Sequence, residues 1–140
     1  LFMSLGAFML NTKNVYIKSL RGLGRSMPFT SGAFVIGGLS LIGVPGTAGF
    51  ISKWLLLEAA LETGYWLLAI LIIVSSLFAV IYIWKIIEVL YFAESTETYS
   101  EVSVLTLMPI WILAFFCIFL GINTSLTVDV ANMATEILFK

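Results

Sequence analysis

The chain has 140 residues, of which 61% are apolar and 11% are charged, and its mean hydropathy is +1.10. This composition excludes an ordinary soluble domain and indicates an integral membrane protein. The formal net charge of −1 gives no sign of nucleic-acid binding, and the single cysteine, Cys117, excludes a disulfide or a cysteine-based metal site within the chain. Any proton relay must use lysine, acidic side chains or water, because the sequence contains no histidine.

The N-terminal part predicts the end of one membrane span followed by a polar loop. Residues 1–10 are apolar and resemble the last turns of a helix, so we interpret the chain as the C-terminal piece of a longer protein. Residues 11–27 contain four cations: Lys13, Lys18, Arg21 and Arg25. An excess of cations is typical of cytoplasmic loops, and this loop is therefore predicted to be cytoplasmic.

The next apolar run, residues 26–52, is interrupted by one proline and three glycines: Gly43, Pro45, Gly46 and Gly49. Proline removes a backbone donor and glycine relaxes the φ restriction, so we expect the helix to break here. Residues 28–62 would be ~52 Å long as a single helix, too long for one crossing. We favour two antiparallel spans, over 28–44 and 47–62; the alternative is one steeply broken element. Broken helices within a bilayer are typical of transport sites.

Two further spans and a tail complete the predicted architecture. The charge-free run 63–84 predicts a span over residues 65–92, and the run 102–128 predicts another over residues 104–122. The predicted fold is all-α, a polytopic transmembrane helical bundle with a discontinuous helix. Residues 1–126 would form the transmembrane domain, and residues 127–140 a surface helix or tail of modest amphipathicity.

Four ionisable residues within or beside the spans are candidates for a proton relay: Lys53, Glu58, Lys85 and Glu88. Lys53 lies ~10 Å beyond Gly46 by helical rise, which is deeper than a lysine at a helix end. Burial disfavours the charged form of an amine, so such a lysine can take up and release a proton. The alternative is a lysine that extends back to the membrane surface. Glu58 lies ~140° around the helix from Lys53, so it would be a modulator and not a direct partner.

Lys85 and Glu88 are three residues apart, which places them on one face of a helix close to its Tyr91 end. A partly exposed ion pair is the favoured interpretation of these two residues, and a relay role is the alternative.

Several strings in this sequence resemble a known family of membrane subunits. The strings are Arg21-Gly-Leu-Gly-Arg25, Met27-Pro28-Phe-Thr30, Gly37-Gly-Leu-Ser-Leu-Ile-Gly-Val-Pro45, Gly49-Phe-Ile-Ser-Lys53-Trp54 and Tyr82-Ile-Trp-Lys85-Ile-Ile-Glu88-Val-Leu-Tyr91-Phe92. They resemble the proton-conducting antiporter-like subunits, a family that includes the Mrp sodium/proton antiporter subunits and subunits L, M and N of respiratory complex I. The last two strings are most similar to the D-type component of the Mrp antiporter. The resemblance extends from residue 1 to about residue 92.

The resemblance implies two inverted repeats, each with a broken helix lined by lysine or glutamate, and makes Lys53 the broken-helix lysine of the second repeat. It implies no cofactor in this chain, because the quinone, iron–sulfur and flavin sites belong to other subunits. It also implies a multi-pass protein of the bacterial or archaeal inner membrane. Its partners would be the lipid bilayer, other membrane subunits, protons and Na⁺. The family's arrangement places the loop over residues 11–27 on the outer side, so both orientations stay open.

Three functions follow from these observations. The favoured one is a proton-translocating subunit of a multi-subunit Na⁺/H⁺ antiporter of the Mrp type. The alternative is a proton-pumping membrane subunit of NADH:quinone oxidoreductase or of a related hydrogenase complex. A passive membrane scaffold is the third, and it predicts that Lys53 tolerates a neutral replacement. None of the three places a catalytic site in this chain.

Overall fold

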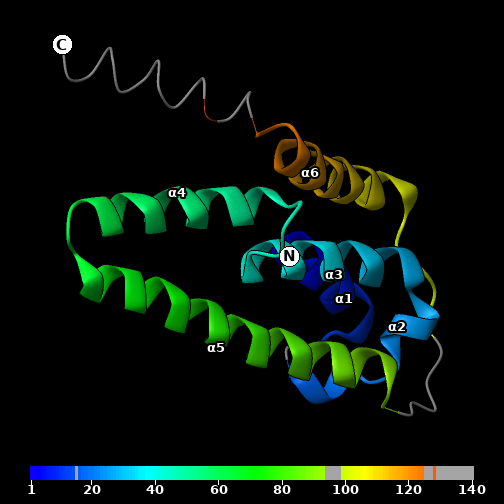
Figure 1. Cartoon of the computed structure of the whole chain (residues 1–140). Helices are drawn as coiled ribbons and strands as arrows, with labels where there is room; N and C mark the ends of the chain where they lie inside the picture. Colours follow the sequence, from blue (N-terminus) through cyan, green and yellow to red (C-terminus); the bar gives the residue numbers. More distant parts are fainter. Residues whose placement is uncertain (15, 94–98, 125–127, 129–140) are drawn as a thin grey trace.

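The computed structural model describes residues 1–14, 16–93, 99–124 and 128. The described residues form helices joined by loops and contain no strand, which confirms the predicted all-α fold (Figure 1). The elements are α1 (Phe2–Thr12), the 3₁₀ turn η1 (Ile17–Leu20), α2 (Leu23–Ser26), α3 (Pro28–Ile42), α4 (Ala48–Glu62), α5 (Trp66–Tyr91) and α6 (Val104–Ile122). The tail predicted over residues 127–140 lies outside the described residues except for Val128.

The neighbours of α5 show how the broken segment runs. Four pairs of residues lie side by side between α5 and the preceding elements: Gly24 with Leu90, Gly38 with Ile83, Lys53 with Ser76, and Ala60 with Leu68. As residue numbers increase along α2, α3 and α4, the numbers of the neighbouring residues on α5 decrease. Both arms of the broken segment therefore run antiparallel to α5 and in the same direction as each other.

This direction corrects our preference for two antiparallel spans over 28–44 and 47–62. The two arms form one steeply broken element, which was the alternative. The first turn of α4 overlaps the last turn of α3, where the Gly49 N–H donates to Ser40 Oγ at 3.2 Å. Measured from Pro28 to Ser40 and from Gly49 to Glu62, the arms rise ~38 Å together, close to the ~39 Å of α5. The unit that matches a membrane crossing is thus the pair of arms, since each arm alone rises only ~22 Å.

Helices α1 and α6 pack on α3 and complete the body of the molecule. Leu1 lies beside Gly37, while Asn11 near the other end of α1 hydrogen-bonds Met27, so α1 runs antiparallel to α3. α6 runs parallel to α3, and its Gly121 lies against Gly46 of the break. The largest buried side chains gather where α1, α2, α3 and the end of α5 meet: Phe8, Leu23, Met27, Phe34 and Leu90.

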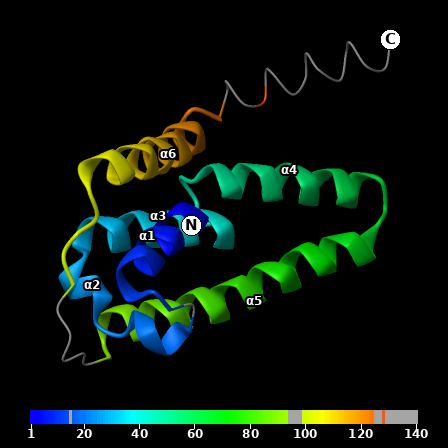
Figure 2. The same cartoon turned by 180° about the vertical axis from the view of Figure 1, so that it is seen from behind.

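Figures 1 and 2 show α4 and the first half of α5 extending beyond the rest of the molecule as a helical hairpin. Within the described residues, α5 and α6 are the helices long and apolar enough to cross a membrane by themselves. The break between α3 and α4 lies where this hairpin joins the rest of the molecule.

Candidate functional site: the helix break and Lys53

The backbone between α3 and α4 is irregular, as the sequence predicts. Residues 43–47 are non-helical and contain Pro45, and two glycines adopt left-handed conformations, with φ of 91° at Gly43 and 89° at Gly46. An L-residue with a side chain is strained at such angles, which explains glycine at these two positions. Gly49 lies within α4, and a Cβ there would overlap the Ser40 carbonyl oxygen. A glycine at position 49 is therefore needed for the close approach of α3 and α4.

Lys53 closes the end of α3 across the break. Its Nζ donates to the carbonyl oxygen of Leu41 at 2.8 Å and to that of Ile42 at 3.0 Å. The last carbonyls of a helix have no partner within the helix, and they carry the negative end of its dipole. A cation at this position therefore satisfies two open acceptors and complements the dipole.

The third hydrogen of the Lys53 ammonium is directed to α5. Ser76 Oγ accepts from Lys53 Nζ at 2.8 Å, and the same hydroxyl donates to the carbonyl oxygen of Ile72 at 3.1 Å. An ammonium has three donors, and all three are used here by three different acceptors. Lys53 thus joins the three helices α3, α4 and α5 at one point.

An open cavity of about 200 Å³ lies beside the lysine. Its lining is apolar except for Lys53 and Ser76, and consists otherwise of Ile42, Gly43, Phe50, Trp54, Leu57, Ile72 and Ile73. A cavity of this size has room for several water molecules, and these two side chains offer them polar partners. A Cβ at Gly43 would lie 3.0 Å from Lys53 Cδ, so glycine there also makes room for the lysine stem.

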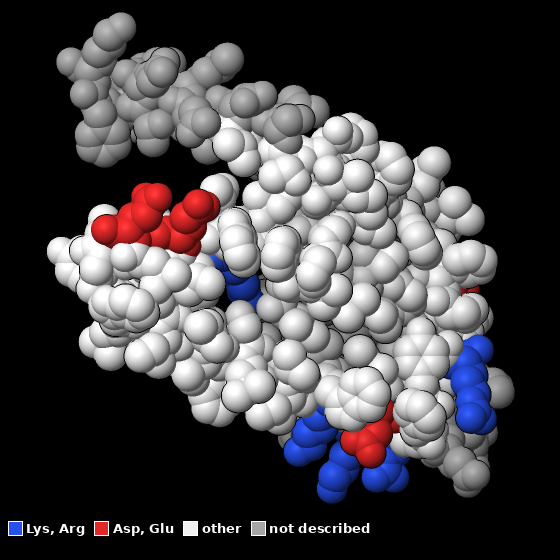
Figure 3. Space-filling view, viewed as in Figure 1, with Lys and Arg blue, Asp and Glu red and all other residues white. Residues whose placement is uncertain are grey.

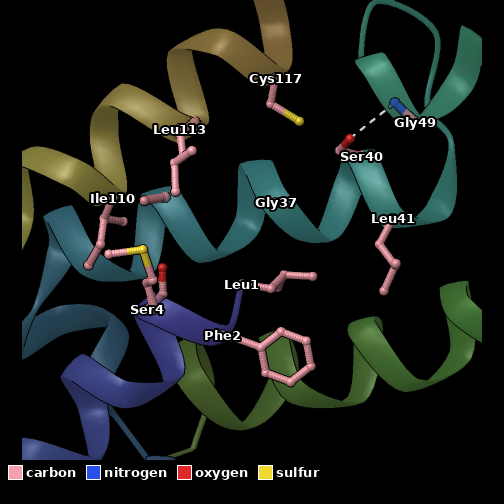
Figure 4. Close-up of a pocket in the computed structure, with 13 residues that line it drawn as sticks. Leu1, Phe2, Ser4, Gly37, Ser40, Leu41, Gly49, Ile110, Leu113 and Cys117 are labelled. Carbon is pink, nitrogen blue, oxygen red and sulfur yellow. Dashed lines mark hydrogen bonds between the residues drawn. The ribbon is translucent and has the colours of Figure 1, made fainter.

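A second cavity, of about 500 Å³, lies on the other side of the break, between α1, α3 and α6. Figure 4 shows Ser40 and Gly49 at its edge, joined by the hydrogen bond between the two arms, with Ser4 and Cys117 also in the lining. Ser4 Oγ is buried and has no hydrogen-bond partner. The break is therefore flanked by a cavity on each side.

The other three predicted relay residues do not reach this site. Glu58 is exposed on α4, and the structure shows no hydrogen bond or ion pair between it and Lys53. Lys85 and Glu88 are exposed on α5, nine or more residues beyond Ser76, which is at least ~13 Å by helical rise. The face seen in Figure 3 is mostly uncharged; acidic side chains gather over α4, and basic side chains with acidic atoms among them lie at the opposite end.

The predicted ion pair between Lys85 and Glu88 is wrong for this structure. Both residues are described, and no nitrogen of Lys85 lies within 4.0 Å of a Glu88 carboxylate oxygen. Both side chains are long and exposed, so fixing them in one geometry would cost conformational entropy for little electrostatic gain.

Sequence reasoning missed two residues that hold this region together. One is Ser76, whose signal was a polar residue at the centre of the apolar run 63–84. The other is Glu101, just before α6, whose carboxylate accepts from the Phe29 N–H at 3.0 Å and from Thr30 Oγ1 at 2.5 Å. Phe29 and Thr30 are in the first turn of α3, so Glu101 caps the N-terminus of the helix that Lys53 caps at the C-terminus.

Comparison with known proteins identifies the family. Residues 1–79 match the family described as NADH:quinone oxidoreductase/Mrp antiporter, TM. The chain belongs to this family. The resemblance to the proton-conducting antiporter-like subunits is therefore confirmed.

Three relatives named NADH-quinone oxidoreductase subunit N illustrate the similarity. The protein of Desulforudis audaxviator is 46% identical over 67 residues, 48% of this chain and 13% of the relative. The protein of Rhodospirillum rubrum is 35% identical over 124 residues, 87% and 25% of the two chains. The protein of Paramagnetospirillum magneticum is 32% identical over 152 aligned positions, 99% and 30% of the two chains. The chain thus spans less than a third of the length of each relative.

The fold has a counterpart among solved structures. A chain of respiratory complex I from Thermus thermophilus with bound NADH superposes with a TM-score of 0.74 and 23% identity, over 86% of this chain and 25% of that chain. This likeness shows the fold. The specific similarity to the D-type component of the Mrp antiporter is not confirmed, since the relatives named above are all subunit N proteins.

Proposed function

We propose that this chain is part of a proton-translocating membrane subunit of NADH:quinone oxidoreductase, of the subunit N kind, and that Lys53 carries the proton across the helix break. The observation that supports a relay role is the position of Lys53, whose three hydrogen bonds end on two unpaired helix carbonyls and one hydroxyl. The names of the relatives support the kind of complex.

The geometry suggests how Lys53 would work. The ammonium form uses all three acceptors, whereas a neutral amine has only two hydrogens and one lone pair. Loss of a proton therefore frees one acceptor and turns the nitrogen into an acceptor for a proton from water. The Ser76 hydroxyl can accept a hydrogen bond from the ammonium and donate one to the lone pair of the neutral amine, so it can pair with either protonation state of Lys53. Water in the adjacent cavity would supply or remove the proton.

The membrane setting and partners are part of the same proposal. Large apolar side chains are exposed along α5 and α6, for example Leu67, Phe78, Leu105 and Phe115. Such a surface needs lipid or other apolar helices to cover it. We place the protein in the bacterial inner membrane as a multi-pass protein, in contact with lipid and with other membrane subunits of the complex.

The family description also covers Mrp antiporters, so the second candidate is a proton/cation antiporter subunit. One experiment separates the two functions. The full-length protein would be tagged in its host and purified from mild detergent, and the co-purifying activity would be measured. We expect NADH oxidation and proton movement that begins when NADH is added to reconstituted vesicles. Proton movement that follows an imposed Na⁺ gradient, with no co-purifying NADH oxidation, would instead establish the antiporter.

A further inference from the structure

The groups that bind the Lys53 ammonium all belong to helices other than its own. Lys53 is part of α4, whereas two of its acceptors are carbonyl oxygens at the end of α3, those of Leu41 and Ile42. The third acceptor is Ser76 Oγ on α5. The three oxygens lie 2.8, 3.0 and 2.8 Å from Lys53 Nζ. Other elements therefore position a set of acceptors that the lysine only enters.

The local backbone leaves the two carbonyls open. In a continuous helix the Leu41 carbonyl would accept from residue 45, but that residue is Pro45, which has no N–H. The N–H groups of residues 43 and 44 donate instead to carbonyls earlier in α3. Among the described residues, no backbone N–H donates to the carbonyl of Leu41 or of Ile42. Both oxygens are thus acceptors at the negative end of the helix dipole, which favours a cation.

The open cavity of about 200 Å³ beside the lysine gives a small molecule access to these acceptors. Ile42, Lys53 and Ser76 are all part of its lining. Shortening the lysine side chain would add the volume of its stem to this space. A methylammonium ion reproduces the end of that side chain, because its carbon corresponds to Lys53 Cε and its nitrogen to Nζ, with the same three N–H donors.

We propose that the carbonyls of Leu41 and Ile42 and the hydroxyl of Ser76 form a binding site for a small primary ammonium ion. Lys53 fills this site in the native protein, and methylammonium from solution can fill it when the lysine is shortened. The proposal rests on the proposed function, since it makes the amine, and not its attachment to α4, the group that carries the proton. Methylammonium can release a proton to water and take one up again, as the lysine does.

The test uses the full-length subunit with Lys53→Ala in the assembled complex, reconstituted into vesicles. NADH-driven charge movement is read with a membrane-potential dye, because a neutral amine crosses the bilayer and would dissipate a pH difference. We expect Lys53→Ala to lose charge movement and methylammonium to restore part of it, at ionic strength held constant with KCl. Half-maximal recovery should need roughly 5 mM or more, because a ligand of two non-hydrogen atoms binds weakly.

Two controls separate occupation of the site from a general effect of the amine. Lys53→Met keeps an unbranched stem where the methyl group of methylammonium must lie, so methylammonium should restore little in this variant. Tetramethylammonium has the charge but no N–H, and it should restore nothing in Lys53→Ala.

A second substitution tests whether the amine binds at these acceptors. Ser76→Ala added to Lys53→Ala should raise the methylammonium concentration for half-maximal recovery roughly 10- to 150-fold, because a hydrogen bond to a charged group is lost. Ser75→Ala added to Lys53→Ala should leave that concentration unchanged, since the structure shows no hydrogen bond between Ser75 and Lys53.

Absence of recovery in assembled Lys53→Ala would overturn the proposal, and so would equal recovery in Lys53→Met or with tetramethylammonium. If Lys53→Ala assembles poorly, methylammonium supplied during growth should raise the assembled amount, and an unchanged amount would also overturn it. These results leave the proposed function intact as long as the lysine variants lose transport. Normal transport by both lysine variants without any amine would overturn the relay function itself, and the proposal with it.

Discussion

At the scale of single residues, the central feature is a lysine whose three hydrogens are all accepted by groups at a helix break. Two of these acceptors are backbone carbonyls, which no substitution of a side chain can remove. Ser76 is the acceptor that mutation can test.

Ser76→Ala should lower proton transport, because a hydrogen bond to a charged group contributes ~1.5–3 kcal/mol and its loss leaves one ammonium hydrogen without a partner. We expect the rate per assembled complex to fall roughly 10- to 150-fold, measured with a pH-sensitive dye in vesicles. Ser75→Ala is the matched control, since Ser75 is exposed and its hydroxyl donates to the Ile72 carbonyl oxygen, as that of Ser76 does, but the structure shows no hydrogen bond between Ser75 and Lys53. Equal effects of the two substitutions would contradict the role given to Ser76.

Two glycines of the break provide a second matched comparison. Gly43 and Gly46 both have φ near +90°, so alanine costs ~1–2 kcal/mol of backbone strain at either position. A new Cβ at Gly43 would press on the Lys53 stem, whereas one at Gly46 would meet nothing within 4 Å. Gly43→Ala should therefore impair transport more than Gly46→Ala, at similar levels of assembled protein. Comparable transport in the two variants would argue against the close fit around Lys53.

The sequence predicted the lysine and the glycines of this site but not its acceptors. Lys53 stands out because a cation is rare in an apolar span, and the glycines stand out because they surround a proline. Ser76 and Glu101 are distant in sequence from the residues that they contact, so only the packing of α5 and of the segment before α6 reveals them. Lys85 and Glu88 had the right spacing on one helix, but spacing alone does not form an ion pair.

At the scale of elements, the discontinuous helix was predicted and its direction was not. Proline and glycine showed where the chain breaks, and helical rise showed that residues 28–62 are too long for one crossing. Two arrangements are consistent with these observations: two antiparallel spans, or one broken element. The choice depends on which residues of α5 face each arm, and this information is not local to the break.

The packing of α6 on the helix break is a second feature of how the elements are arranged. Gly121 of α6 lies so close to Gly46 and Thr47 that an added Cβ would clash with their backbone atoms. Gly121→Ala should force α6 away from the break and lower the thermal stability of the assembled complex by several degrees. Gly6→Ala in α1 meets nothing within 4 Å and should leave the melting temperature unchanged or slightly higher, because alanine favours helix. Equal melting temperatures for the two variants would contradict the close packing of α6 on the break.

At the scale of the whole molecule, the main feature is an apolar surface along α5 and α6. In the most apolar stretch of α5, and likewise of α6, only 17% of residues are buried within the described structure. Composition alone predicted this character, because an apolar fraction of 61% cannot be buried in a bundle of this size. The Mrp type of complex, which the sequence analysis favoured, is not confirmed: the similarity to subunit N proteins fits the alternative, NADH:quinone oxidoreductase, better.

The most direct test of the account is proton transport by the intact complex carrying Lys53→Arg, measured beside Lys53→Met and with the amount of assembled protein measured in the same vesicles. Arginine keeps the positive charge at the end of α3 but does not release its proton in proteins. Methionine keeps an unbranched apolar stem and has no titrating group. If Lys53 is a proton relay, both variants assemble and both lose proton transport. Near-normal transport by well-assembled Lys53→Arg would show that only the charge is needed, and near-normal transport by Lys53→Met would remove Lys53 from the mechanism.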